Sequence, residues 1–162
     1  MTAKDAIKFL LVSTQKWVHQ YVSDLSDDDL LVRPVPAANP IAWQLGHMIA
    51  SEVMYFQAKV PGVAPVELPA GFAERHANET AAKDPPTGFL KKDEYLALFD
   101  RVRGATLAAV DRLSDADLDK ESGWGDYAPT VGTLLLRIGD HDMMHAGQFT
   151  VLRRKLGKPV LV

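Results

Sequence analysis

Four long stretches of this chain carry apolar side chains at spacings of three and four residues, and this periodicity constrains the fold more than any other feature. The stretches cover residues 2–22, 40–59, 92–113 and 130–157. Such spacing places the apolar side chains on one face of an α-helix. Helices of about 20 residues are about 30 Å long, and four of them bury their apolar faces by packing on one another. The sequence therefore predicts an all-α, up-and-down four-helix bundle.

Local signals mark where these helices begin and end. Asn39 is expected to cap the second helix, with Pro40 in its first turn. Thr130 is expected to cap the fourth helix, which should end at Gly157. No stretch shows the pattern of a strand, so we expect no sheet.

The bundle is predicted to consist of two similar helical hairpins. The sequence Leu-Ser-Asp-x-Asp-Leu follows the first helix at residues 25–30 and the third helix at residues 113–118. In each copy the serine and the aspartate three residues later suit a capped helical turn, although two unrelated caps would give the same letters. A long segment, residues 60–91, joins the hairpins. A loop of this length either walls a pocket or is a passive crossover.

Composition excludes several classes of protein. The chain has 162 residues, 47% of them hydrophobic and 24% charged, which fits a single domain over residues 1–162. Its net charge of −3 offers no basic excess for nucleic acid. No stretch reaches the roughly 20 apolar residues of a membrane span, and no signal-peptide cleavage site is evident, so we expect a cytoplasmic protein with no membrane partner. Cysteine is absent, which leaves histidine and carboxylate as metal ligands.

Three histidines form the candidate metal site. His141 and His145 are four residues apart, so their side chains lie one above the other on a helix. If the second and fourth helices run parallel, His47 lies within about 6 Å of the same height. Three neutral imidazoles would leave coordination positions open to water or substrate. The structural alternative is a chance helical pair and a core histidine bonded to a backbone carbonyl, Gln44 or Ser51.

Other polar residues near these histidines have weaker claims. Glu52 and Asp142 suit partners that orient an imidazole, but each also suits a solvated or ion-paired position. We expect Asp142 to face solvent. Tyr55 either offers its hydroxyl to a bound ligand or packs in the core.

Two further histidines and an aromatic pair lie away from these positions. His19 and His76 have no partner by spacing, and we expect them to be structural or exposed. Trp124 and Tyr127 precede the fourth helix and either line the mouth of a pocket or pack as an aromatic loop. The residue pattern assigns no catalytic residue.

Three short motifs in this order resemble the DinB/YfiT-like superfamily of metalloenzymes. They are Trp43-Gln44-Leu45-Gly46-His47, Pro129-Thr130-Val131 and His141-x-x-x-His145-x-x-Gln148. With the helices and the central loop, the resemblance covers nearly the whole chain. It implies a four-helix bundle, commonly a homodimer, that binds a divalent metal ion, often nickel or zinc, on three histidines. Those positions match His47, His141 and His145, and the resemblance implies no DNA chemistry.

The same resemblance suggests a reaction class. Characterised relatives include transferases that join bacillithiol or mycothiol to electrophiles, which implies a small-molecule substrate and a low-molecular-weight thiol. A thiolate on a trihistidine metal is a good nucleophile at neutral pH and requires no protein cysteine. One alternative is a metal-dependent hydrolase. The others are a non-catalytic bundle that binds a metal or small ligand, and a structural bundle whose histidines are merely buried.

Overall fold

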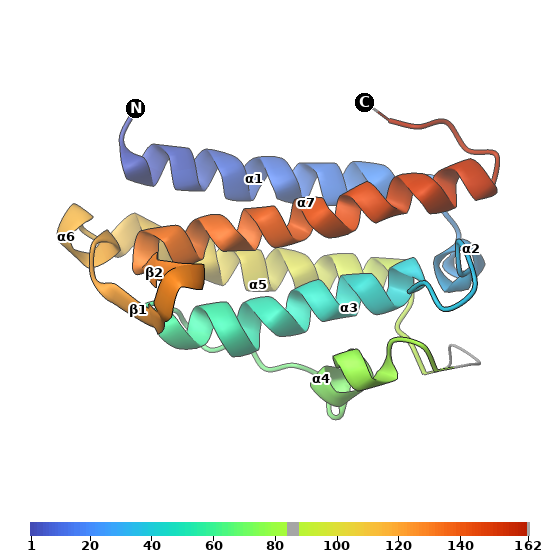
Figure 1. Ribbon diagram of the computed structural model, residues 1–162, viewed down its shortest axis with the longest axis horizontal. Helices are drawn as coiled ribbons and strands as arrows, with labels where there is room; N and C mark the ends of the chain where they lie inside the picture. The colour runs from blue at the N-terminus through green and yellow to red at the C-terminus, as the bar shows by residue number, and fades with distance from the viewer. Residues whose placement is uncertain (84–87, 162) are drawn as a thin grey trace.

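Four long helices lie side by side in the molecule (Figure 1). In this computed structural model, which describes residues 1–83 and 88–161, they are α1 (Ala3–Val22), α3 (Ile41–Ser51), α5 (Lys92–Arg112) and α7 (Val131–Lys155). A π-helical turn, η1 (Glu52–Phe56), and a 3₁₀ turn, η2 (Gln57–Lys59), prolong α3. The predicted four-helix bundle is confirmed.

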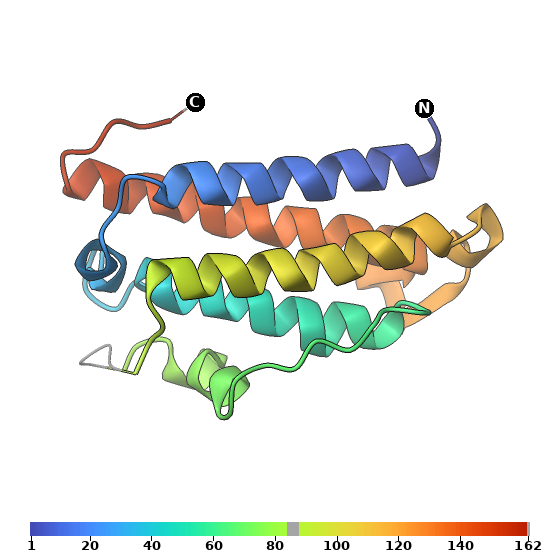
Figure 2. The same cartoon turned by 180° about the vertical axis from the view of Figure 1, so that it is seen from behind.

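The four helices run up, down, down and up in chain order, because the described part of the central segment, residues 60–83, leads the chain back along the bundle (Figures 1 and 2). The second and fourth helices run antiparallel, so the parallel arrangement under which His47 was placed near the height of His141 is not met. Gln44 near the start of α3 contacts His145, whereas Phe56 further along contacts His141, so the contacts run in opposite order on the two helices. α1 and α3 each contact both α5 and α7, which places the two helices of one hairpin at opposite corners of the bundle.

The repeated sequence forms two short capped helices. α2 (Asp27–Leu31) follows α1, and α6 (Asp115–Leu118) follows α5. In each, the serine before the helix, Ser26 or Ser114, accepts a hydrogen bond from the backbone of the aspartate three residues later, whose carboxylate bonds back to the serine. These reciprocal bonds satisfy amides that the helix start leaves unpaired. The predicted repeat of capped turns is confirmed.

The start of α3 differs from the expectation. Pro40 is the residue before the helix and makes no side-chain cap, and the carbonyl of Asn39 accepts a hydrogen bond from the Gln44 side chain. The predicted Asn39 cap is therefore wrong. For α7 the signals are confirmed: Thr130 accepts a hydrogen bond from the backbone three residues on, and Gly157 beyond the end has a φ of 67°.

A small antiparallel hairpin precedes α7. It pairs β1 (Glu121–Trp124) with β2 (Ala128–Thr130), with the 3₁₀ turn η4 (Gly125–Tyr127) between them. The expectation of no strand is wrong here. Strands of four and three residues are too short to show the alternation that identifies a strand in a sequence.

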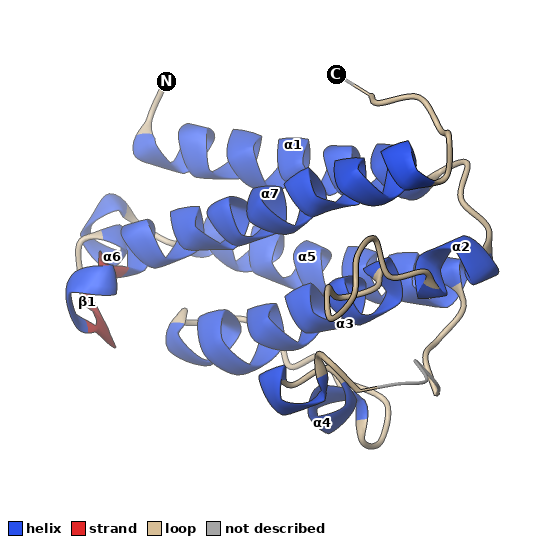
Figure 3. Ribbon diagram, turned by 45° about the vertical axis from the view of Figure 1, so that its right-hand side comes forward, coloured by secondary structure: helices blue, strands red, loops and turns tan. Residues whose placement is uncertain are grey.

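The long central segment lies against α3 and carries structure of its own (Figure 3). It includes α4 (Phe72–Arg75) and the 3₁₀ turn η3 (Asn78–Thr80). Phe72 is fully buried and joins the core between the long helices. Within the described parts of the chain, every helix is too short or too polar to cross a lipid bilayer.

Candidate metal centre

The imidazoles of His47, His141 and His145 converge between α3 and α7. One nitrogen from each lies within 4.8 Å of the other two. The Nε2 atoms of His141 and His145 are 3.2 Å apart. Two nitrogens on a tetrahedral zinc ion, with bonds of about 2.0–2.1 Å, are about 3.3 Å apart. The spacing of His141 and His145 therefore fits two ligands of one ion, with a nitrogen of His47 close by.

Hydrogen bonds fix which ring nitrogen faces the centre. The Nδ1 atom of His47 lies 3.0 Å from the carbonyl oxygen of His76, and a carbonyl only accepts, so this nitrogen carries the proton. The Nδ1 of His145 donates in the same way to Oε1 of Gln44, at 3.0 Å. The amide of Gln44 is itself oriented, because its nitrogen donates to the carbonyl of Asn39. Both rings are left with an Nε2 lone pair for a metal ion.

Burial keeps the three imidazoles neutral. It lowers the pKa of His47, and lowers the pKa of His141 to about 4 and that of His145 to about 3, with the neighbouring imidazoles adding to both shifts. The neutral ring is the form that binds a metal ion. At neutral pH all three rings are therefore in the form that a metal ion requires.

Two cavities, of about 240 and 450 Å³, open onto the centre, and both are lined by His47, Ser51, Tyr55 and Asn78. The central segment supplies six residues between positions 73 and 79 as one wall of the smaller cavity. It therefore walls a pocket, which was one of its two sequence interpretations. From this side small molecules can reach His47, and through the larger cavity His141.

Aromatic side chains line the larger cavity. Phe56, Trp124 and Tyr127 border it together with His141. Trp124 packs edge-on against Tyr127 with ring centroids 5.3 Å apart, so this pair both packs together and lines the pocket. Tyr55 is 51% exposed and borders both cavities, so its place is at the pocket and not in the core.

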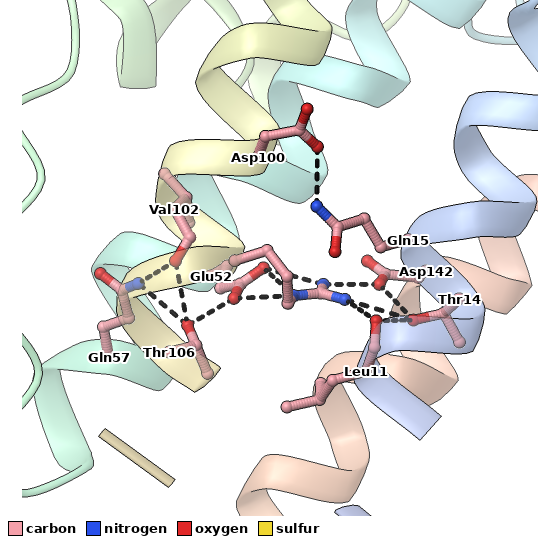
Figure 4. A network of polar contacts seen from close by, with 10 residues as sticks. Leu11, Thr14, Gln15, Glu52, Gln57, Asp100, Val102, Thr106 and Asp142 are labelled. Carbon is pink, nitrogen blue, oxygen red and sulfur yellow. Dashed lines mark hydrogen bonds and ion pairs between the residues drawn. The ribbon is translucent and has the colours of Figure 1, made fainter. Parts of the chain in front are cut away.

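A buried ion network joins α5 to α1, α7 and the π-helical turn after α3 (Figure 4). Arg103 of α5 is fully buried and donates to Glu52 at 2.9 Å and to Asp142 at 2.6 Å. Thr106 donates to Glu52, and Thr14 of α1 donates to Asp142. The expectation that Asp142 faces solvent is wrong, since it is 2% exposed. Both carboxylates therefore pair with Arg103, and none of their described hydrogen bonds is to an imidazole.

Two carboxylates share one guanidinium in this network. Burial and the nearby Glu52 raise the pKa of Asp142 to about 6, against the opposing effect of Arg103.

The sequence interpretation missed Arg103. A signal was present, because Arg103 stands four residues after Phe99 and three before Thr106, on the apolar face of the third helix.

The remaining two histidines lie outside the cluster, as expected. His19 is partly exposed and pairs with Asp100, with 2.7 Å between nitrogen and oxygen. His76 is 1% exposed and bonds to the carbonyl of Phe72 and the hydroxyl of Tyr95. Its backbone oxygen accepts a hydrogen bond from the His47 ring, and it also borders the smaller cavity.

Known proteins share this architecture. A crystal structure described as the conserved protein of a locus from Enterococcus faecalis is similar with a TM-score of 0.70 and 16% identity, over 98% of this chain and 99% of that one. YfiT from Bacillus subtilis, described as "a probable metal-dependent hydrolase with an unusual four-helix bundle topology", has a TM-score of 0.67 and 18% identity, over 96% and 89%. A search of curated proteins finds no match. The family model of the DinB superfamily matches residues 10–149, and this chain therefore belongs to the DinB superfamily.

Proposed function

We propose that His47, His141 and His145 bind one divalent metal ion, nickel or zinc, in an enzyme that acts on a small molecule. The observation that carries this proposal is the convergence of three neutral imidazoles beside an open cavity. Imidazole is a ligand that suits both zinc and nickel. Three protein ligands leave the ion with positions for substrate, as in catalytic sites.

The reaction we favour is transfer of a low-molecular-weight thiol to an electrophile. A divalent ion at this centre would lower the pKa of a bound thiol and so supply a thiolate nucleophile at neutral pH. Because the chain has no cysteine, the thiol must come from a co-substrate. Gln44 and the carbonyl of His76 orient two of the imidazoles. Phe56 and Trp124 give the cavity an aromatic wall on which an apolar part of a substrate could pack, and Tyr55 borders the same cavity.

A metal-dependent hydrolase is the second candidate. Its support is the description of YfiT, whose fold this chain shares, together with a cavity that is open to water. The two reactions differ in what they consume. Transfer removes a free thiol and an electrophile in equal amounts, whereas hydrolysis forms product without any thiol.

An activity screen with matched histidine variants tests the proposal. Untagged protein loaded with zinc or nickel would be assayed with thiol and electrophile pairs, and separately with ester and amide substrates. We expect thiol-dependent product from the parent, none from His145→Ala, and parental activity from His19→Ala, because His19 lies outside the centre. Product formed without thiol would favour the hydrolase. Equal activity of the parent and His145→Ala would refute a trihistidine enzyme.

The homodimer, the single domain and the cytoplasmic location stay predictions. Exposed apolar side chains lie on one face of α7 and suit a homodimer contact: Leu136, Met143, Met144 and Val151. Analytical ultracentrifugation of the parent and Met144→Lys tests the dimer. A dimeric parent and a monomeric variant are expected, and a monomeric parent would contradict it.

A further inference from the structure

The ring of His76 lies directly on the backbone of α3, next to a proposed metal ligand. A methyl group placed on Gly46 would lie 2.1 Å from the Cδ2 atom of His76, inside the van der Waals contact distance. Gly46 immediately precedes His47. Because glycine has no side chain, the central segment can approach the backbone of α3 closely at the position just before His47.

Three parts of the chain hold that ring in place. The Nδ1 atom of His76 donates to the carbonyl of Phe72 at 2.7 Å, so Nε2 is free to accept from the hydroxyl of Tyr95 at 2.8 Å. The Tyr95 oxygen in turn accepts from the backbone nitrogen of Leu90. Phe89 stacks on the imidazole with centroids 5.5 Å apart. Burial also lowers the pKa of His76 to about 4, so the ring stays neutral.

The anchored segment reaches His47 from two sides. The carbonyl of His76 accepts the Nδ1 proton of His47 at 3.0 Å. Trp43 stacks on the His47 ring, with centroids 4.7 Å apart and planes 11° from parallel. The indole nitrogen of Trp43 donates to the hydroxyl of Thr80, at the far end of the same segment. Both contacts therefore lead back to residues 72–80.

We propose that residues 72–80 are a clamp that fixes the orientation and the tautomer of His47, with His76 as its positioning residue. The inference rests on the proposed metal centre. Without the clamp, the His47 ring would turn between rotamers and carry its proton on either nitrogen, and a metal ion would have to order it on binding. Loss of such outer partners typically weakens metal binding by about 10–100-fold.

Glycine substitutions test the clamp with close controls. Gly46→Ala pushes the methyl group into the His76 ring, whereas the same change at Gly104 or Gly147 meets nothing within 4 Å. All three positions are helical, so the gain in helix propensity is shared. Zinc affinity would be measured by competition with a chelator. We expect 10–100-fold weaker binding by Gly46→Ala and parental affinity for both controls.

A second variant and a second readout separate positioning from folding. His76→Phe keeps an aromatic ring but loses both hydrogen bonds of the imidazole. If Gly46→Ala fails to fold, Tyr95→Phe serves as a milder variant, because it removes only the hydroxyl that donates to His76. Long-range proton–nitrogen NMR spectra of metal-free protein report the tautomer of His47. We expect a proton fixed on Nδ1 in the parent and exchange between both nitrogens in His76→Phe.

The outcomes distinguish this inference from the proposed function. A purely structural role would lower the thermal midpoint of these variants and leave both zinc affinity and the His47 tautomer as in the parent, which would overturn the clamp. A parent that binds no zinc would refute the metal centre. In that case the tautomer comparison still decides whether the clamp fixes His47.

Discussion

Replacement of Arg103 by methionine should be one of the most destabilising single changes in the bundle. Arg103 is fully buried and is the cation that Glu52 and Asp142 share, and it also donates to the carbonyl of Leu11. Methionine fills a similar volume but leaves two buried carboxylates without their cation. Breaking a buried ion pair from one side costs about 3–5 kcal/mol. Domains of this size are stable by about 5–15 kcal/mol, so the loss is a large share of the total.

The cost should depend on pH. In Arg103→Met the pKa of Asp142, which burial already raises and Arg103 no longer lowers, lies above that of the unfolded chain, so the folded state binds more protons and gains stability as the pH falls. Urea unfolding of metal-free protein, followed by circular dichroism at pH 7.5 and 5.5, measures this. The free-energy difference from the parent should shrink by about 1 kcal/mol or more at the lower pH, since one pKa unit corresponds to about 1.4 kcal/mol.

Two further variants complete the test. Arg103→Met combined with Glu52→Gln and Asp142→Asn has no buried charge in the network, and it should recover at least about 2 kcal/mol relative to the single variant. Lys8→Met, which breaks the exposed pair with Asp111, should cost no more than about 1 kcal/mol. A loss below about 1 kcal/mol for Arg103→Met at pH 7.5 would refute the reasoning.

Three other predictions concern single contacts. The pKa of His76 is about 4 in the folded protein and near 6.5 in the unfolded chain, so its contribution to stability is present above pH 6.5 and is lost as the pH falls. Urea unfolding should therefore show that the stability of the parent relative to His76→Phe declines by about 2 kcal/mol from pH 7.5 to 5. A stability difference that stays constant with pH would contradict this prediction. Gly139→Ala would place a methyl group 2.5 Å from the Leu10 side chain, where α1 and α7 meet, and should lower stability by about 1–3 kcal/mol in the same assay, whereas unchanged stability would show that the helices separate freely. Gln44→Leu removes the acceptor of His145 and should weaken zinc binding by about 10–100-fold in chelator competition, a result that parental affinity would exclude.

Local sequence signals predicted the helices and their capped turns well. The spacing of apolar residues defines one buried face per helix, and the serine caps depend on contacts only three residues apart. The direction of each helix was harder to predict. It depends on the path of the central segment, whose described residues 60–83 return along the bundle, and helical periodicity carries no information about that path.

The candidate site was predicted in part. Helical spacing brought His141 and His145 to one face, and the motif around His47 supplied the third imidazole. The partners that orient these rings come from other segments: Gln44 crosses to α7, and His76 belongs to the central loop. Long-range hydrogen bonds of this kind leave no periodic pattern in a single sequence.

The structure nevertheless gives a physical reason for several letters of the Trp-Gln-Leu-Gly-His motif. Trp43 stacks on His47, Gln44 orients His145, and Gly46 leaves room for the His76 ring. A motif that reads as a short helical segment therefore specifies contacts with two other parts of the chain. Each role was visible only once those parts were in place.

Metal content tests the central claim most directly. Untagged parent protein and His145→Ala would be purified identically without added metal, and bound nickel and zinc would be measured by mass spectrometry before and after incubation with each ion. The trihistidine centre predicts close to one ion per chain in the loaded parent and a large loss in the variant. A parent that fails to retain either ion, or a variant that retains as much as the parent, would contradict the account.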